Sequence, residues 1–312
     1  MLDKRQKGID MIKLSNSVGL KGKNLEKDVK RIQALINVYR RANSEEALAV
    51  SGKNSTELEN AIASFQKDHM KLKITTSKVE ATSGTLTSLK KYLSSIFKPV
   101  AIVAPTYGEV TWNSEGAEGG KFHSRLLTVP TNSSGLTIGR GYDMKEKLQS
   151  KIVTNMTTAG IPSKNIDVIK KAAGLSGTTA EWFIIENDLL DFQVTTDQQK
   201  ALFKISYDEE SDQVKKICKK SDVIEAYGET DWDKLNSAIK GITVDLKFRG
   251  DYTGSARKLI QKSIADNDFS EFKKKLKDKT NWSNVPQDRF DRRVAYLDKQ
   301  VEPAKVTGTK PK

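Results

Sequence analysis

Apolar residues in the first hundred positions recur at intervals of three and four, the period of one face of an α-helix. The first stripe consists of Leu25, Val29, Ile32, Ile36 and Tyr39. The second follows Asn54 and Glu57, which are spaced as a capping box, and consists of Leu58, Ile62 and Phe65. The third follows a Ser83-Gly84 turn and consists of Leu86, Leu89 and Leu93. Three amphipathic helices in residues 1–98 predict a small three-helix bundle.

A segment with proline near both ends, Lys98-Pro-Val-Ala-Ile-Val-Ala-Pro105, interrupts the helical period. Proline fixes φ and keeps the preceding residue out of the helical region, so an extended linker is predicted over residues 99–107. Beyond the linker, the apolar runs 124–129 and 136–140 flank the turn residues Pro130-Thr-Asn-Ser-Ser-Gly135. This arrangement predicts a β-hairpin.

The remainder of the chain returns to the helical period. One stripe consists of Trp182, Ile185, Leu189 and Phe192, and another of Trp232, Leu235, Ile239, Ile242 and Leu246. Helices around a small hairpin sheet predict a mostly helical α+β domain over residues 108–300, preceded by the three-helix bundle. Residues 301–312 are rich in Pro, Lys and Thr and are expected to form a disordered tail.

The composition excludes several classes of protein. The chain has 312 residues, of which 37 % are hydrophobic and 30 % charged, so it can bury a sizeable core. No apolar run approaches the ~20 residues of a membrane span, and we expect no membrane insertion. The charged start, Met1-Leu-Asp-Lys-Arg-Gln-Lys-Gly8, lacks the apolar segment of a signal peptide, so synthesis in the cytoplasm is expected.

Cysteine and histidine are too sparse for a disulfide framework or a zinc site. Cys218 is the one cysteine, and it lies among lysines without an evident histidine partner, which favours a helix residue over a nucleophile. His69 and His123 lie far apart with no cysteine nearby, a spacing that argues against zinc. We therefore expect chemistry without a metal or another cofactor.

The net charge of +13 is unevenly distributed along the chain. Residues 1–98 carry an excess of 9 positive charges, whereas residues 99–300 carry an excess of 2. A basic surface attracts polyanions such as nucleic acid, anionic lipid or the carboxylate-rich bacterial wall, or it is a solvated face with no special partner. The net charge alone does not distinguish these partners. The sequence contains no recognition-helix or RNA-binding motif that would favour nucleic acid.

The first hundred residues resemble a family of cell-wall modules. The motifs that carry the resemblance are Asp28-Val-Lys-Arg-Ile-Gln-Ala-Leu-Ile-Asn37, Leu48-Ala-Val-Ser-Gly52, Ala61-Ile-Ala-Ser-Phe-Gln66 and Gly84-Thr-Leu-Thr-Ser-Leu89. In this order they are similar to the three-helix peptidoglycan-binding domain. One loop departs from the family pattern, because Val50-Ser-Gly-Lys-Asn-Ser-Thr56 lacks the usual acidic residue and second glycine. The resemblance implies that peptidoglycan is a partner.

Two carboxylates of the second domain are candidates for acid–base chemistry. Cleaving a glycosidic bond needs one acid to protonate the leaving oxygen and one carboxylate to activate water. Glu115 precedes a glycine that lets a ligand approach closely, and Asp143 follows the predicted hairpin strand and a Gly-x-Gly turn. The hydroxyl of Thr137, six residues earlier, could hold a water. Glu118 is an alternative acid, and a carboxylate pair alone is weak support because 40 residues are acidic.

Ordered motifs across residues 108–298 add a family resemblance. They are Glu115-Gly116, Thr137-Ile-Gly-Arg-Gly141, Trp282-Ser-Asn-Val-Pro-Gln-Asp-Arg289 and Arg292-Arg293-Val294. This series is similar to the phage-type lysozymes. The resemblance implies a lysozyme-like fold in which Glu115 is the general acid and Thr137 helps to position the water. The aspartate that the family carries six positions before the threonine is absent, since Thr131 stands there.

The pesticin-like branch of muramidases is the closer match. Its pattern Thr-x-Gly-x-Gly-Tyr-Asp occurs here as Thr137-Ile-Gly-Arg-Gly-Tyr-Asp143. In that branch the aspartate after the tyrosine is required together with the glutamate and the threonine. This implies Glu115, Thr137 and Asp143 as catalytic residues. Arg140 and Tyr142 are expected to bind substrate, or else to shape the hairpin and its rim.

The two resemblances together imply a monomeric peptidoglycan hydrolase. It would cleave the β-1,4 bond between N-acetylmuramic acid and N-acetylglucosamine, with inversion, in the periplasm of a bacterial host or target cell. It would be a phage endolysin or an antibacterial effector delivered by a type VI-like machine, and only the effector implies an immunity protein. The alternatives are a non-catalytic wall-binding or structural protein that retains the fold, and a nucleic-acid-binding protein.

Overall fold

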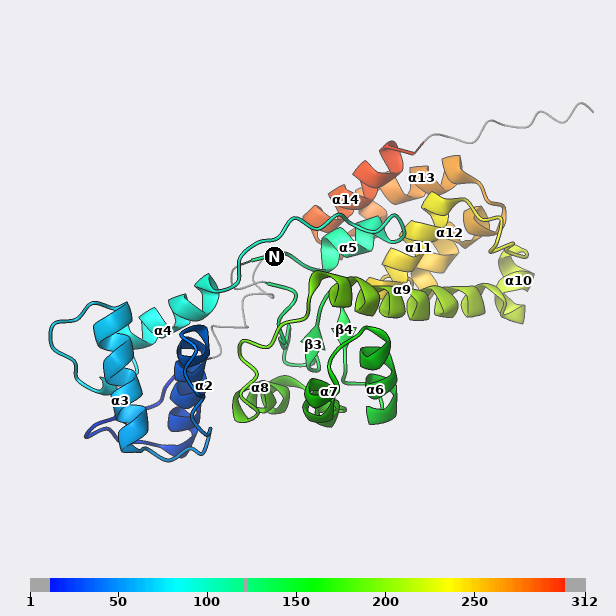
Figure 1. The fold of residues 1–312 in the computed structure, drawn as a ribbon. Helices are drawn as coiled ribbons and strands as arrows, with labels where there is room; N and C mark the ends of the chain where they lie inside the picture. The colour runs from blue at the N-terminus through cyan, green and yellow to red at the C-terminus, as the bar shows by residue number, and fades with distance from the viewer. Residues whose placement is uncertain (1–11, 120–122, 301–312) are drawn as a thin grey trace, which may run out of the picture. The chain divides into compact units, whose positions relative to one another are not determined.

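The computed structural model describes residues 12–119 and 123–300. It is mostly helical, with two small antiparallel sheets of two strands each (Figure 1). This agrees with the predicted mixture of helices and a small sheet. The predictions for the chain start at Met1 to Gly8 and for the tail 301–312 lie outside the described residues.

The chain divides into two compact units, each built from two separate segments. The first unit comprises Met1–Ile102 and Gly116–Phe203, and the second comprises Val103–Glu115 and Lys204–Lys312. These units do not follow the boundary at residues 99–107 that we predicted from sequence. That boundary separates two modules along the chain, and it stays a prediction.

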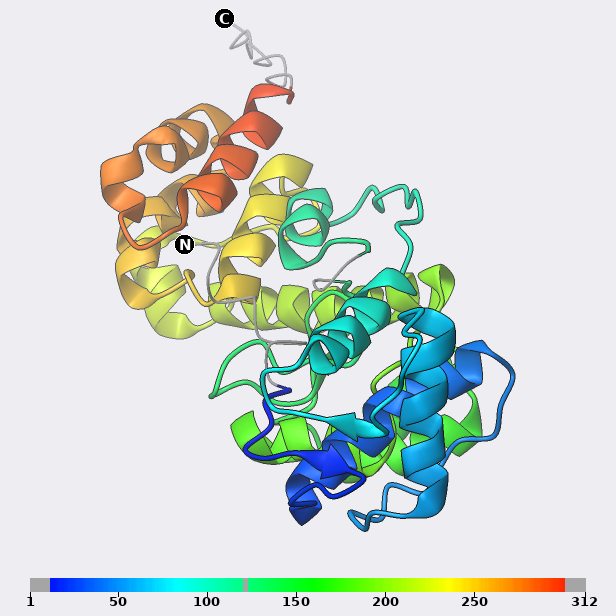
Figure 2. The same cartoon turned by 90° about the vertical axis from the view of Figure 1, so that its left-hand side faces the viewer.

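Three helices and one sheet make up the N-terminal part of the first unit. The helices are α2 (Glu26–Ala42), α3 (Thr56–Ser64), which continues as the π-helix η2 (Phe65–His69), and α4 (Gly84–Ser95). The strands β1 (Val18–Gly19) and β2 (Lys78–Val79), drawn as arrows in Figure 2, pair antiparallel. Val18 lies opposite Val79 in the register. Helix α2 packs against both α3 and α4.

The predicted apolar stripes form the core of these three helices, with one exception. The buried side chains are Val29, Ile32, Ile36, Tyr39, Leu58, Ile62, Phe65, Leu86, Leu89 and Leu93. Leu25 was wrongly placed in the core: it is 46 % exposed, because it precedes the first turn of α2. The three helices are therefore confirmed as elements.

The predicted capping box at the start of α3 is wrong by one residue. Ser55, rather than Asn54, is the N-cap, and its hydroxyl accepts a hydrogen bond from the Leu58 backbone N–H. Asn54 instead donates its amide to the Glu59 carboxylate at 2.7 Å. A serine in extended conformation can satisfy a free N–H of the first turn as well as an asparagine can, and the spacing does not distinguish them.

The rest of the first unit contains a hairpin and several short helices. These elements are β3 (Thr137–Ile138), β4 (Tyr142–Asp143), α6 (Gln149–Thr158), α7 (Ser163–Ile169), the 3-10 helix η4 (Lys170–Ala172), α8 (Gly177–Glu186) and α9 (Thr196–Cys218), which enters the second unit at Lys204. In the predicted stripe of this region, Ile185 and Leu189 are buried, whereas Trp182 and Phe192 are half-buried. Helix α8 ends before Leu189, so the stripe continues into a turn.

Ion pairs connect the two parts of the first unit. Arg41 of α2 contacts the carboxylates of Asp188 and Asp191 at 2.5 and 2.6 Å. Lys30 pairs with Glu186 at 2.9 Å. Part of the positive charge of α2 is therefore compensated by carboxylates that follow or end α8.

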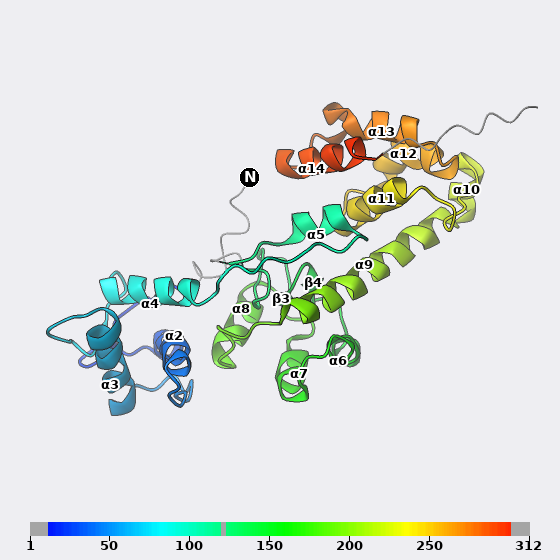
Figure 3. The same ribbon diagram turned by 45° about the horizontal axis from the view of Figure 1, so that its top comes forward.

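In its described residues, the second unit contains helices joined by turns and no strand. Its helices are α5 (Glu109–Glu115), the later part of α9, α10 (Ser221–Tyr227), α11 (Ser237–Arg249), α12 (Gly254–Ala265), α13 (Phe269–Lys277), the 3-10 helix η5 (Lys279–Trp282) and α14 (Gln287–Asp298). Helix α5 packs against α11 and α14 (Figure 3). The predicted stripe from Trp232 to Leu246 is buried, although α11 begins only at Ser237.

Two tryptophans lie in the core of the second unit. Trp112 of α5 and Trp282 of η5 are buried, and the indole of Trp282 donates to the Lys275 carbonyl at 3.0 Å. Both therefore act as core side chains. Within the part of the chain that the structure describes, no helix combines the length and apolar character needed to cross a bilayer.

Candidate active site

The β3–β4 hairpin brings two of the three predicted catalytic residues together. Thr137 lies directly opposite Asp143 in the antiparallel register. On its other side, the backbone of Thr137 exchanges two hydrogen bonds of 2.8 Å with Thr128. Gly139 and Gly141 in the turn have φ values of 64° and 88°, which side chains resist and glycine permits. The hairpin therefore fixes Thr137 between two neighbours.

The predicted hairpin was correct in kind but displaced along the chain. The runs 124–129 and 136–140 were expected to be its strands, yet they meet through the single bridge between Thr128 and Thr137. The regular pair is formed by 137–138 and 142–143. Gly139 and Gly141, separated by one residue, allow a tighter chain reversal than the predicted six-residue turn. This Gly-x-Gly spacing is the feature of the sequence from which the true position of the hairpin could have been predicted.

Backbone groups orient the Asp143 carboxylate. Its Oδ2 accepts the N–H of Gly135 at 3.0 Å, and its Oδ1 accepts the N–H of Lys145 at 2.8 Å. Asp143 is half-buried, so part of the group remains accessible. The buried Thr137 donates its hydroxyl hydrogen to the Gly135 carbonyl at 3.1 Å. Thr137 and Asp143 are thus held by the same short stretch of backbone.

The third predicted catalytic residue lies in the second unit. Glu115 is the last residue of α5, and its side chain is 19 % exposed. Its Oε1 lies 2.5 Å from Nη1 of Arg289, which comes from α14. Trp112 anchors the same helix in the core. Glu115 is therefore a partly accessible carboxylate on a helix end, held by one guanidinium.

A buried charge network stands behind Glu115. Asp245 of α11 is fully buried and bonds both Arg289, at 2.6 Å, and Arg293, at 2.7 Å. Arg293 also bonds Asp251 at 2.9 Å. Burial would raise the pKa of Asp245, but the two guanidinium groups outweigh it and hold that pKa below its ordinary value. The charge of Arg289 is consequently shared between Asp245 and Glu115.

Sequence reasoning assigned no role to Asp245 and Arg293, although Arg293 stood in a noted motif. The available signal was a carboxylate inside an apolar run: Asp245 follows Ile242 and precedes Leu246. A buried carboxylate needs charged partners. Arg289 and Arg293, four residues apart, face one side of a helix and could have been proposed as those partners.

The alternative acid, Glu118, is engaged within the first unit. Its side chain is 10 % exposed and accepts hydrogen bonds from Arg125 Nε at 2.9 Å and Gln199 Nε2 at 3.0 Å. His123 Nδ1 lies 3.5 Å from the same carboxylate. Glu118 therefore has internal partners on several sides, an arrangement typical of a structural carboxylate.

His123 is buried in this cluster in a defined tautomer. Its Nδ1 accepts the N–H of Gly119 at 2.7 Å, so the ring hydrogen belongs on Nε2, which faces the Gln193 side-chain oxygen at 3.2 Å. Burial, and next the charge of Arg125, lower the pKa of His123 from 6.5. The imidazole is thus stabilised in its neutral form.

Arg140 and Tyr142, the predicted substrate-binding residues, are both buried. Arg140 donates to the Gly116 carbonyl at 2.8 Å, and the Lys147 ammonium lies 5.1 Å from the centre of the Tyr142 ring. These contacts hold both side chains against neighbouring residues of the first unit. Substrate binding by either residue stays a prediction.

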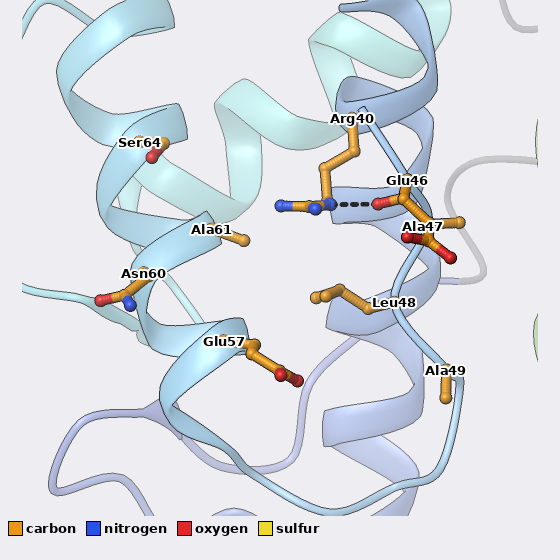
Figure 4. A pocket seen from close by; sticks show the side chains of 9 residues that line it. All are labelled: Arg40, Glu46, Ala47, Leu48, Ala49, Glu57, Asn60, Ala61 and Ser64. Atoms are coloured by element: carbon orange, nitrogen blue, oxygen red, sulfur yellow. Dashed lines mark hydrogen bonds between the residues drawn. The ribbon is translucent and has the colours of Figure 1, made fainter. Parts of the chain in front are cut away.

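A groove lies between α2, α3 and the segment that joins them (Figure 4). Its volume is about 450 Å³, and it is lined by Arg40, Glu46, Ala47, Leu48, Ala49, Glu57, Asn60, Ala61 and Ser64. Arg40 and Glu57 lie toward opposite ends, with Leu48 between them (Figure 4). The guanidinium is steadied by the Glu46 carbonyl at 2.6 Å and the Glu45 carboxylate at 2.9 Å.

The described residues offer neither a metal cluster nor a reactive thiol. Among residues 12–119 and 123–300, no three His, Cys, Asp or Glu side chains are grouped to hold a metal ion. Cys218 is the last residue of α9, is buried and receives a hydrogen bond from Gln261, which confirms it as a helix residue.

Fold and site define a mostly helical protein with a carboxylate-bearing β-hairpin. Residues 108–294, more than half of the chain, match the family described as a domain of unknown function, DUF8812, and the chain belongs to that family. No curated protein matches the chain. The family match begins at the residue where we place the start of the second sequence domain.

Proposed function

We propose that the protein is a peptidoglycan hydrolase of the muramidase type, with a lysozyme-like fold over residues 108–300. The observation that supports this most strongly is the hairpin pairing of Thr137 with Asp143, whose carboxylate is oriented by two backbone N–H groups. Such a carboxylate, beside a fixed hydroxyl, is suited to hold and polarise one water molecule.

In the proposed reaction, Glu115 transfers a proton to the oxygen that leaves as the 4-hydroxyl of N-acetylglucosamine. The bond from that oxygen to C1 of N-acetylmuramic acid breaks. A water held by Asp143 and Thr137 attacks C1 from the opposite face and gives its proton to Asp143. Solvent then returns both carboxyl groups to their starting states. The configuration at C1 inverts, and no cofactor takes part.

Arg289 supports the role of Glu115. The fully buried Asp245 binds the Arg289 guanidinium. Arg289 is therefore held in place from the core and can orient the Glu115 carboxylate.

The three helices of residues 1–98 are proposed as a peptidoglycan-binding module. Two features support this: the excess of 9 positive charges and the groove whose ends carry Arg40 and Glu57. The peptides of the bacterial wall carry carboxylates and amines that complement these groups. Binding at a second point raises the local concentration of the enzyme on an insoluble polymer.

The test is digestion of purified sacculi by the full chain. After borohydride reduction, mass spectrometry of the released fragments should find muramitol at the new ends, because the bond at C1 of muramic acid is broken. Reduced glucosamine ends would indicate a glucosaminidase instead. Absence of any soluble fragment, with protein co-sedimenting with the sacculi, would favour the non-catalytic wall-binding alternative.

The biological setting proposed for this activity is the periplasm of a bacterial host or target cell. A phage endolysin and an injected antibacterial effector both fit the proposed chemistry. An effector requires the producing cell to make an immunity protein that binds it, whereas an endolysin does not. The neighbouring gene should therefore distinguish them: co-expression of an adjacent product that blocks sacculus digestion would identify the effector.

A further inference from the structure

One glycine contacts both functional groups of the hairpin. The N–H of Gly135 donates to Asp143 Oδ2 at 3.0 Å, and its carbonyl accepts from Thr137 Oγ1 at 3.1 Å. The two polar atoms of a single residue thus orient the carboxylate and the hydroxyl. Sequence reasoning had treated Gly135 only as a turn residue.

Gly135 is itself fixed by the start of α8. It forms an antiparallel bridge with Ser176, the N-cap residue of that helix. The neighbouring Ser134 carbonyl accepts the N–H of Gly177 at 3.0 Å. Gly135 is buried, so its hydrogen bonds do not compete freely with water. The segment cannot shift without breaking these contacts.

There is no room for a side chain at Gly135. A methyl group there would collide with Oδ1 of Asp143 and would lie 2.6 Å from the backbone nitrogen of Lys145 and 2.7 Å from its Cβ. The Lys145 backbone nitrogen is one of the two donors that orient the carboxylate, and it cannot move aside as the end of a flexible side chain could. A larger residue would therefore displace Asp143 rather than a flexible neighbour.

We infer that Gly135 is a positioning residue that places Asp143 and Thr137 together around one water molecule. The inference rests on the proposed function. Because the hydroxyl hydrogen of Thr137 is engaged by the Gly135 carbonyl, the free lone pairs of Oγ1 accept a hydrogen from the water. Asp143 accepts the second hydrogen, and the lone pairs of the water oxygen remain available for the sugar carbon.

The first experiment compares Gly135→Ala with Gly160→Ala in the full chain. Gly135→Ala should lower kcat about 100-fold with little change in KM, since a misplaced group costs about that much. Gly160, between α6 and α7, has φ of 73°, and an added methyl group there would meet no atom within 4 Å. Gly160→Ala should therefore lower the melting temperature while keeping kcat within about twofold of the wild type. Wild-type kcat in Gly135→Ala would overturn the inference.

A second experiment tests the hydrogen bond from Gly135 to Asp143 directly, for the case in which Gly135→Ala does not fold. In protein labelled with [¹⁵N]glycine, Asp143→Asn should move the amide signal of Gly135 more than that of Gly84, where an added methyl group would meet no atom within 4 Å. An unmoved Gly135 signal would refute the hydrogen bond and the inference with it. Inactive wild-type protein with a moved signal would refute the proposed function and retain the positioning geometry.

Discussion

The two carboxylates of the proposed reaction are held by different physical means. In the first unit, Asp143 is oriented by the backbone N–H groups of Gly135 and Lys145. In the second unit, Glu115 is oriented by the Arg289 guanidinium, which is fixed in turn by buried Asp245. A backbone donor survives replacement of its side chain, whereas a buried charge network fails when one member is removed. The orientation of Asp143 therefore depends on the conformation of the main chain, whereas the orientation of Glu115 depends on the balance of buried charges.

The largest effect on activity is expected from removing either carboxylate. Glu115→Gln keeps the shape but removes the transferable proton, and Asp143→Asn removes the charge that polarises water. Each should lower kcat by about 10²- to 10⁴-fold. The measurement is fragment release from sacculi, with circular dichroism confirming the fold.

The matched control for Asp143→Asn is Lys145→Ala. That variant keeps the backbone N–H, and its activity should stay within about twofold of the wild type if main-chain donors alone matter. Robust turnover by Glu115→Gln would remove Glu115 as the acid and point to Glu118. Full activity of Asp143→Asn would leave the proposed water without its base.

The next largest effect is expected on the stability of the second unit. Asp245→Asn leaves two buried guanidinium groups without their shared anion, which should lower the free energy of unfolding by about 3–5 kcal/mol. Denaturant titration of the full chain measures this. Asp288→Asn, on the same helix as Arg289 but with a 65 % exposed side chain, should cost under about 0.5 kcal/mol. Equal effects would contradict the role of charge balance.

A smaller loss of activity is expected for Thr137→Ala. The hydroxyl positions water but carries no charge and transfers no proton, so its removal should lower kcat by about 10- to 100-fold. Thr137→Ser retains the hydroxyl and should recover most of the rate. If both variants lose activity equally, the methyl group or the strand pairing, rather than the hydroxyl, is what matters at Thr137.

The smallest expected effect is on the pH dependence of stability, which differs between the two units. The lowered pKa of His123 means that the unfolded chain takes up its proton at a higher pH than the folded chain. This contribution to stability is complete above pH 6.5 and is lost as the pH falls from 6.5 through the folded-state pKa. For Asp245 the loss begins only below its ordinary value of 3.8.

Melting temperatures between about pH 2 and 8 test this order on the wild type and His123→Gln. The variant should lose part of the pH dependence just below 6.5, where the neutral imidazole matters. His69→Gln is the matched control, since His69 is exposed. An unchanged slope in His123→Gln would contradict the role of His123 in the acid response.

Local patterns were sufficient to predict the three N-terminal helices of this protein. The helical stripes located α2, α3 and α4 because an apolar side chain every third or fourth residue has only one face on which to be buried. Leu25 was misplaced because periodicity continues past a helix end that only the backbone defines. The capping residue of α3 was missed because Asn54 and Ser55 are both able to cap a helix.

The sequence by itself determined which residues are candidates for chemistry: Glu115 before a glycine, and Thr137 and Asp143 around a Gly-x-Gly turn. Only the tertiary structure decided what holds them. The hydrogen bond between Gly135 and Asp143 joins positions 8 residues apart, and the ion pair between Asp245 and Arg289 joins positions 44 residues apart. Such partners are selected by burial, because a charge or polar group removed from water must find its counterpart within the fold, wherever in the chain that counterpart lies.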